Sequence, residues 1–223
     1  MALTRLPLFP LPLVLFPNAP QLLHIFEPRY RDMLRDCLAG DQRFGLSLLS
    51  PERADRPAPG DVGCRARVEQ YRLLPDGRYN ILAVGEERYV LQDIVFSETQ
   101  YLVGAVEFFF DDDDAASLDE LAGNVRRQFD AFVASWRELQ DFVTAPGDIP
   151  SDPTDLSFHV SANLEADPDT QEELLRLTST RMRLQRLLAL LETENANRQT
   201  RVDALRLARG NGHGPHEPDI VDQ

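Results

Sequence analysis

The sequence predicts an α+β protein, in which a mostly antiparallel β-barrel is followed by an α-helical lobe. Apolar residues alternate with polar ones along the first half of the chain and recur every three or four residues along the second half. The periodicity changes at the acidic run Asp111-Asp112-Asp113-Asp114. We therefore predict a barrel domain with one helix at 1–112, a helical domain at 113–209 and a flexible tail at 210–223.

Short alternating segments predict the strands of the barrel. Cys64, Ala66 and Val68 alternate with charged neighbours, which places one face of that strand in a core and the other in water. A helix is predicted from Pro28, which suits a first helical turn, to about Gly40. Further strands are predicted at 44–48, 79–84, 89–96 and 101–110, with turn residues at 75–77.

Capping boxes and apolar stripes predict the helices of the second half. Ser117 and Thr170 are each followed three residues later by a glutamate, which is the pattern of a capping box. The first box opens a helix that extends to Leu139, and the second opens a helix that extends to Leu205. Between them we predict a loop at 144–155 and a short helix at 156–164.

The composition excludes several classes of chemistry. The basic residues number 23 and all are arginine, so the chain has no lysine for a P-loop, a Schiff base or a Ser–Lys dyad. The formal net charge of -14 opposes non-specific binding to nucleic acid, which depends on basic residues that replace counterions.

The cysteines and the N-terminus indicate a cytoplasmic protein that is not bound to a membrane. Cys37 and Cys64 are too few and too far apart for a disulfide framework, which favours a reducing compartment. The apolar N-terminus imitates a signal peptide, but Pro7, Pro10 and Pro12 interrupt it. No apolar run approaches the ~20 residues that a membrane-spanning helix needs.

An ordered series of short segments along the chain matches the landmarks of a known family. The most specific is His24-Ile25-Phe26-Glu27-Pro28-Arg29-Tyr30, preceded by Leu6-Pro7-Leu8-Phe9-Pro10-Leu11 and followed by Phe44-Gly45-Leu46. Gly104-Ala105-Val106-Glu107 and Arg183-Leu184 match later landmarks. Together these segments resemble the N-terminal, substrate-binding domain of Lon protease over 6–195, although Pro12-Leu13 stands where that family usually has Arg and Asp.

The resemblance implies a barrel related to the PUA fold together with a helical lobe. It also implies a protein that holds polypeptide substrates or partners rather than cutting them, as an adaptor in protein quality control does. Because neither the ATPase module nor the protease module that follow this domain in Lon protease is found in the sequence, we expect a protein similar to the stand-alone bacterial members of the family.

Two aromatic segments allow both a structural and a binding interpretation. Phe26 and Tyr30 could belong to a recognition surface, but we favour a core position for both, with a local pair between Glu27 and Arg29. Phe109 lies on the opposite face of its strand from the apolar residues, so it either packs against the helical lobe or contacts a bound polypeptide. Phe109 is our one candidate binding residue.

No cofactor and no metal site is predicted. The four aspartates at 111–114 lack the spacing and the glycine of a calcium loop, so we expect a solvated domain junction there. His213 and His216 resemble a metal site in composition only, since nothing in the predicted tail would fix their geometry.

No catalytic residue is assigned either. His24 and His159 are the candidate bases outside the tail, and neither cysteine nor any serine lies in a nucleophile motif. A small-molecule enzyme would need one of these histidines in a pocket between the lobes, beside a Ser, a Cys or a carboxylate.

The leading hypothesis is a non-catalytic protein that binds unfolded or exposed polypeptide segments, or a specific protein partner, in the cleft between barrel and helical lobe. The acidic charge would favour basic segments, with strong salt dependence. The alternative is an RNA-binding PUA-like module, which would need a continuous positive stripe formed by Arg65, Arg67, Arg72, Arg78 and Arg88. The end of the last helix could also meet a second copy of the chain.

Overall fold

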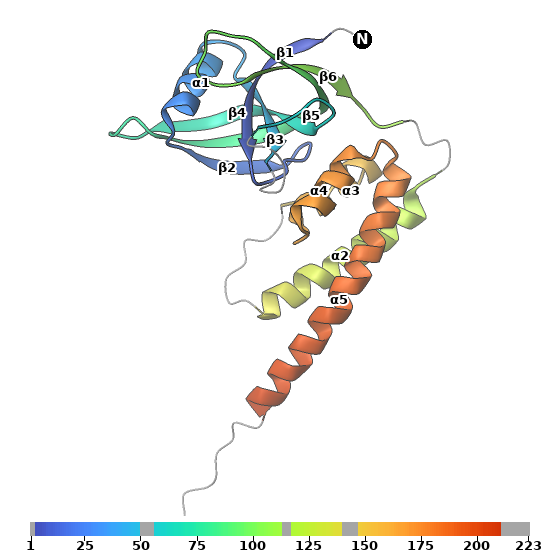
Figure 1. Ribbon diagram of the computed structural model, residues 1–223. Helices are drawn as coiled ribbons and strands as arrows, with labels where there is room; N and C mark the ends of the chain where they lie inside the picture. The colour runs from blue at the N-terminus through green and yellow to red at the C-terminus, as the bar shows by residue number, and fades with distance from the viewer. Residues whose placement is uncertain (1–2, 50–55, 113–116, 140–146, 211–223) are drawn as a thin grey trace, which may run out of the picture.

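The computed structural model describes residues 3–49, 56–112, 117–139 and 147–210. Its first half is a six-stranded sheet that closes into a ring, and its second half is helical (Figure 1). The strands and the helix of the first half are β1 (Thr4–Leu11), β2 (Pro20–Ile25), α1 (Pro28–Ala39), β3 (Arg43–Leu48), β4 (Val62–Leu73), β5 (Tyr79–Val95) and β6 (Val103–Phe109).

The ring has the strand order β2-β5-β4-β3-β1-β6, and an additional pairing of β5 with β6 closes it. Of the pairings between these strands, only that of β1 with β3 is parallel. The predicted fold class, a mostly antiparallel closed sheet followed by helices, is therefore confirmed.

The strand β5 is longer than predicted because the segments 79–84 and 89–96 form one strand. Its first half pairs with β2 and its second half with β6, while β4 runs along both halves. The strands β1 and β2 were not predicted from periodicity, since Pro7 and Pro10 interrupt β1. Both prolines are tolerated because each half of β1 pairs with one strand. The first half pairs with β6 and the second half pairs with β3.

The helix α1 was predicted correctly and contributes one face to the core inside the ring. Tyr30, Met33, Leu34 and Cys37 are buried at helical spacing, and the ring of Tyr30 lies 4.4 Å from that of Phe9, measured between centroids. Pro28 begins the helix, and Glu27 forms the predicted pair with Arg29.

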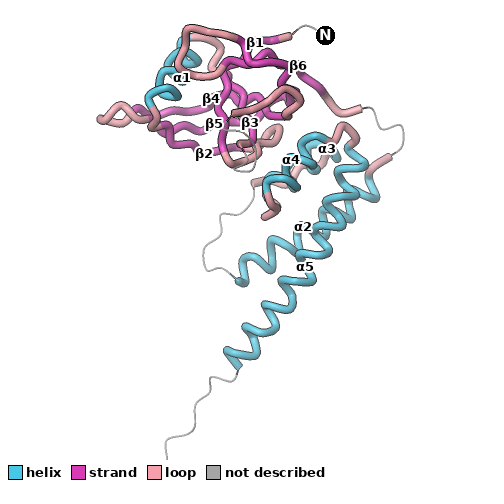
Figure 2. The backbone as a smooth tube through the Cα atoms, viewed as in Figure 1, coloured by secondary structure: helices cyan, strands magenta, loops and turns pink. Residues whose placement is uncertain are grey.

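The helical half contains α2 (Asp119–Leu139), α3 (Pro153–Asn163), α4 (Pro168–Arg176) and α5 (Thr180–Gly210). Figure 2 shows α2 and α5 side by side, with the two short helices between them and the sheet. Phe16 and Val62 from the sheet half belong to the same apolar cluster as Phe129, Leu184 and other helical residues, so the two halves share a core.

The single long helix expected from Thr170 onward is two helices, which corrects that expectation. Asp167 caps α4 by accepting a hydrogen bond from the Thr170 amide at 2.9 Å, and α4 ends at Arg176. The Nη1 atom of Arg88 donates to the carbonyls of Leu175 and Leu177 at 2.9 Å and 2.6 Å. A continuous helix would need these carbonyls for its own amides, so the arginine stabilises the break.

Within the described ranges, none of the helices is both long enough and apolar enough to cross a membrane. The tail predicted at 210–223 lies outside those ranges from residue 211 onward.

Candidate functional site

The free edge of β2 carries two exposed apolar side chains. Strand alternation buries Leu23 and Ile25 and turns Leu22, His24 and, just past the strand end, Phe26 to the outside. Leu22 is 76% exposed and Phe26 is 59% exposed, so the expected core position of Phe26 is wrong. The reason is that Phe26 continues the alternation of β2, while α1 begins only at Pro28.

The backbone of the same strand is unpaired on one side. Among the described residues β2 pairs only with β5, so alternate N–H and C=O groups of β2 point away from the sheet. We call Leu22, His24, Phe26 and this free edge the β2 surface. The sequence signal that could have revealed it is the alternation of Leu22, His24 and Phe26 with Leu23 and Ile25.

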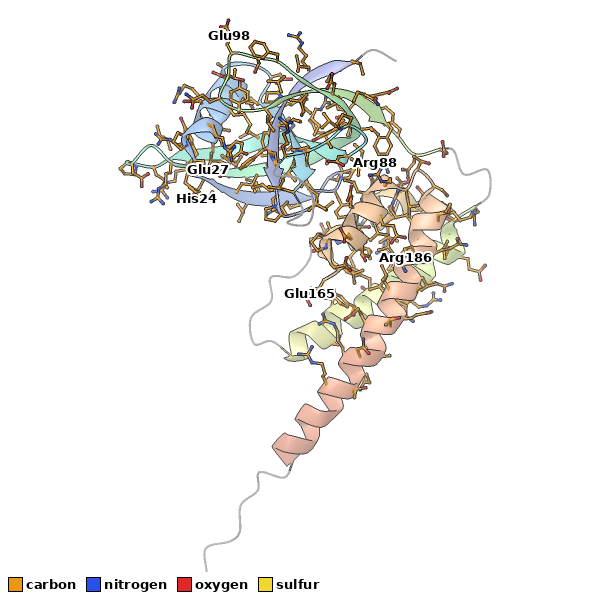
Figure 3. All side chains as sticks on the ribbon, viewed as in Figure 1. His24, Glu27, Arg88, Glu98, Glu165 and Arg186 are labelled. Carbon is orange, nitrogen blue, oxygen red and sulfur yellow. The ribbon has the colours of Figure 1, made fainter. Side chains whose placement is uncertain are left out.

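His24 is held in place by polar neighbours on the β2 surface. Its Nδ1 lies 2.6 Å from Oδ1 of Asn80, and Nη1 of Arg78 lies 3.2 Å from its Nε2. Both contacts are satisfied when Nδ1 carries the proton and Nε2 accepts from the guanidinium. The ring stacks on Phe26, with 6.0 Å between centroids, and lies near one end of β2 (Figure 3).

A cavity of about 700 Å³ lies between the sheet and the helices, where β2 begins. We call it the interlobe cavity. One wall is the turn at 17–20, a second is the segment before α3, and the third is a single face of α3. The lining residues are Pro17, Asn18, Ala19, Pro20, Gly147, Asp148, Pro150, Asp155, His159, Ala162 and Asn163.

Hydrogen bonds fix the turn at 17–20 to β5 and to α3. Asn18 has a φ of 61°, its amide donates to the carbonyl of Gly85 at 2.9 Å, and its Nδ2 donates to Oδ1 of Asp155 at 3.0 Å. A Cβ on Gly85 would lie 2.1 Å from the carbonyl oxygen of Phe16. Glycine is therefore required where this turn crosses β5.

His159 lines the interlobe cavity and is neutral near pH 7. Burial and the positive charge of Arg126 hold the pKa of His159 below its ordinary value. Its ring packs edge-on against Phe129 at 5.8 Å between centroids, and its buried Nε2 has no hydrogen-bond partner among the described residues. Within the described residues, neither His159 nor His24 forms a hydrogen bond with a serine, a cysteine or a carboxylate.

The two cysteines are free thiols inside the protein. Burial, with a smaller effect of Asp41 and Asp36, raises the pKa of the Cys37 thiol to about 12. Burial also raises the pKa of Cys64. Because the thiolate is the nucleophile, neither cysteine is activated for covalent chemistry.

Asp111 joins the end of the sheet to the helices through two buried arginines, which corrects the expected solvated junction. Its carboxylate accepts hydrogen bonds from Arg88 of β5 and from Arg183 of α5, whose side chains are 3% and 0% exposed. Thr180 also donates to it. The sequence could not show this, since Arg183 lies far along the chain. Figure 3 places Arg88 at the junction.

The electrostatics of this Asp111 cluster favour the charged carboxylate. Burial opposes ionisation, but hydrogen bonds from Arg183 and Thr180 and the charges of Arg183 and Arg88 outweigh it and lower the pKa of Asp111. Asp112 accepts a hydrogen bond from the Thr178 hydroxyl at 2.8 Å. Asp113 and Asp114 lie outside the described residues.

Phe109, the candidate binding residue, lies beside this cluster. It is half-buried and packs against the apolar cluster of the helices, and the guanidinium of Arg88 lies 4.5 Å from the centroid of its ring. Its role in binding stays a prediction.

The arginines considered for RNA binding are interleaved with carboxylates. Glu86 accepts hydrogen bonds from Arg43, Arg65 and Arg67 at 2.7–3.2 Å, and Arg78 pairs with Asp76. Arg88, another arginine of the expected stripe, is buried at the junction. Burial opposes ionisation of Glu86, but these arginines outweigh it and lower the pKa of Glu86. The neutralised charges do not support a continuous positive groove.

Metal binding gains no support from the part of the chain that the structure describes. No group of three or more His, Cys, Asp or Glu side chains is arranged there to hold an ion. His213 and His216 lie outside that part.

Comparison with known proteins identifies the class of this fold. The family of the ATP-dependent protease La (LON) substrate-binding domain matches residues 5–193. The chain therefore belongs to that family.

Two similar solved structures agree with this assignment. A Lon N-terminal domain protein from Xanthomonas campestris is 26% identical, with a TM-score of 0.63, over 83% of this chain and 98% of that one. The N-terminal domain of Lon protease from the Mycobacterium avium complex, at 16% identity and a TM-score of 0.61, covers 85% of this chain and 98% of its own and shares the fold.

Among curated proteins the chain is similar to Lon proteases. It is 24% identical to that of Brucella suis over 82% of this chain and 25% identical to that of Solibacter usitatus over 85% of it. The chain spans only 23% and 24% of the length of these two relatives.

Proposed function

We propose that the protein binds extended apolar segments of polypeptides along the β2 surface without catalysing a reaction on them. The observation that carries the proposal is the pair of exposed side chains, Leu22 on β2 and Phe26 directly after it, at a strand edge that pairs with no other described strand. The family description, a substrate-binding domain, supports binding of polypeptides in general.

The proposed mechanism is the addition of a strand to the sheet. Backbone groups of the bound segment pair with the free edge of β2, which gives affinity that is largely independent of sequence. Leu22 and Phe26 lie four residues apart on one face, so they contact alternate apolar side chains of the segment. The net charge of -14 adds a preference for basic segments that weakens with salt.

The cleft between the lobes was expected to be the capture site, but we place the apolar contacts with the polypeptide on the β2 surface. The lining of the interlobe cavity is mostly proline, small or polar, so it offers few apolar anchors. The exposed apolar side chains nearest to it in the chain are Leu22 on β2 and Phe26 directly after it, and β2 starts at the rim of that cavity. Phe109 remains a candidate contact with a bound polypeptide, although its ring already packs against Arg88.

The test is fluorescence anisotropy with a labelled peptide that alternates valine and threonine and carries two phenylalanines. Replacing Leu22→Ser or Phe26→Ser should weaken binding at least about tenfold, because central apolar anchors dominate such interfaces. The matched control is Phe96→Ser. Phe96 is 93% exposed and follows the end of β5 that is remote from β2.

Equal affinity of the β2 variants and the Phe96 variant would contradict the proposal. A labelled RNA is the second probe, and tight binding of RNA by the native protein would favour the alternative module. Each variant needs an unchanged far-UV circular dichroism spectrum, which is expected since both β2 side chains are exposed.

A further inference from the structure

We infer that the interlobe cavity binds an ammonium or guanidinium group. Its volume of about 700 Å³ is that of a small-ligand site. Asp148 and Asp155 are among its lining residues, while none of the lining residues is an arginine. With His159 neutral, the two charged lining residues are both acidic, so a cation is the complementary ligand.

The arginine whose charge acts on His159 is engaged elsewhere. Arg126 influences His159 through its charge, but its Nη2 donates to the carbonyls of Ile149 and Pro150 in the segment before α3. Its guanidinium is therefore bound to the backbone of one wall, and among the described residues it forms no hydrogen bond with Asp148 or Asp155.

Acceptors for a cation are distributed along α3. Asp155 uses Oδ1 for Asn18, and within the described residues no hydrogen bond to its Oδ2 is found. Asn163, at the other end of the helix, donates through Nδ2 to the carbonyl of His159, which leaves its Oδ1 available. The two residues are separated by about 12 Å along the axis, because each residue of a helix rises about 1.5 Å.

The end of α3 adds a second attraction for positive charge. A helix C-terminus carries partial negative charge, which proteins commonly neutralise with Lys, Arg or His in the last turn. The last turn of α3 contains no basic residue, and Ala162 and Asn163 of this turn line the cavity. A cation in the cavity would supply the missing charge.

The cavity is continuous with the β2 surface. Pro20 lines the cavity and is also the first residue of β2, where it pairs with Val84. A segment bound along β2 would thus place one end at the cavity mouth. The cation would then be a basic side chain of the bound segment, and this assignment rests on the proposed function. A free polyamine as the ligand would not depend on it.

The experiment uses two kinds of ligand to distinguish a peptide side chain from a free polyamine. The first is a pair of labelled peptides for the β2 surface that end in arginine or in citrulline, its neutral isostere. We expect the arginine peptide to bind about tenfold more tightly to the native protein, since hydrogen bonds to charged groups have this magnitude. The second ligand is spermidine, and its binding is measured by isothermal titration calorimetry.

The variant Asp155→Asn should abolish the preference for arginine and any heat from spermidine. Its amide oxygen can still accept from Asn18, so the turn at 17–20 is preserved. Asp148→Asn is the second variant, and Asp130→Asn, an exposed change on α2 with the same loss of charge, is the control.

Each outcome decides the matter. A preference for arginine that Asp155→Asn removes and Asp130→Asn retains assigns the cavity to a peptide side chain. Spermidine binding with the same pattern assigns it to a free polyamine. Equal affinity for both peptides together with no spermidine binding overturns the inference. In that last case, tight binding of both peptides would leave the proposed function intact.

Discussion

Replacement of Asp111 by asparagine should destabilise the protein strongly. The change removes the carboxylate that Arg88 and Arg183 share, and it leaves two guanidinium groups that are 3% and 0% exposed without a counter-charge. Removing one partner of a buried ion pair costs about 3–5 kcal/mol. That is a large fraction of the free energy of unfolding of a typical domain, about 5–15 kcal/mol.

Other hydrogen bonds keep the loss within this range. Arg88 retains the carbonyls of Leu175 and Leu177, and Nε of Arg183 retains the Ser157 hydroxyl at 2.8 Å. The donors are therefore not all orphaned, although the charge is uncompensated. We expect a decrease of about 3–4 kcal/mol in the free energy of unfolding.

The assay is urea denaturation followed by far-UV circular dichroism, with Asp112→Asn as the control. Asp112 is the next residue and loses the same charge, but among the described residues its carboxylate accepts a single, exposed hydrogen bond, from Thr178. Its replacement should cost less than about 1 kcal/mol. If the two variants have the same midpoint and slope, the buried cluster does not stabilise the junction and the reasoning is refuted.

Two further predictions concern Gly85, which contacts the turn before β2, and His159, which lines the interlobe cavity. Gly85→Ala should destabilise by about 3 kcal/mol or more in urea denaturation, because the new Cβ would lie 2.1 Å from the Phe16 carbonyl oxygen. Gly123→Ala in α2, where the nearest atom is 3.7 Å away, should be neutral or stabilising, and a comparable loss there would argue against a steric cause. The lowered pKa of His159, due to burial and Arg126, means that the unfolded state takes up a proton before the folded state as the pH falls. Its contribution is present above the unfolded pKa of about 6.5 and is lost in more acidic solution, so the native protein should lose more stability than His159→Gln between about pH 7.5 and 5.5. Parallel stability curves would show that His159 is not the group responsible.

Local chemistry was sufficient to predict several elements from the sequence. The apolar spacing after Pro28 predicts α1 because one face of a helix must be buried, and the alternation at Cys64, Ala66 and Val68 predicts β4 for the same reason. The core position predicted for Phe26 was wrong because Phe26 was grouped with Tyr30 of the helix. The alternation of β2 instead assigns Phe26 to the exposed face.

The remaining features depend on residues that are distant in sequence. Asp111 is adjacent to three more aspartates and so resembles a solvated run, but Arg88 and Arg183 reach it from other elements. The same two arginines stabilise the break between α4 and α5, since both donate to the carbonyl of Leu177. The interlobe cavity is formed by a turn near residue 18 and a helix near residue 159, which no local pattern connects.

The pairing of β1 with β6 has a consequence for the order of folding during synthesis. The first strand cannot complete its hydrogen bonds until the last strand of the ring has left the ribosome, since Thr4 pairs with Val106 and Pro7 with Val103. Contacts of such long sequence separation close slowly. Arg88 stays hydrated until the helical half is synthesised, because that half contains the carbonyls of Leu175 and Leu177 to which it donates. Arg183, which shares Asp111 with Arg88, also lies in the helical half. A nascent chain that pauses between these two stages has a completed ring but leaves the apolar side chains of Phe16 and Val62 exposed to water, because the helices that cover them follow later in the sequence.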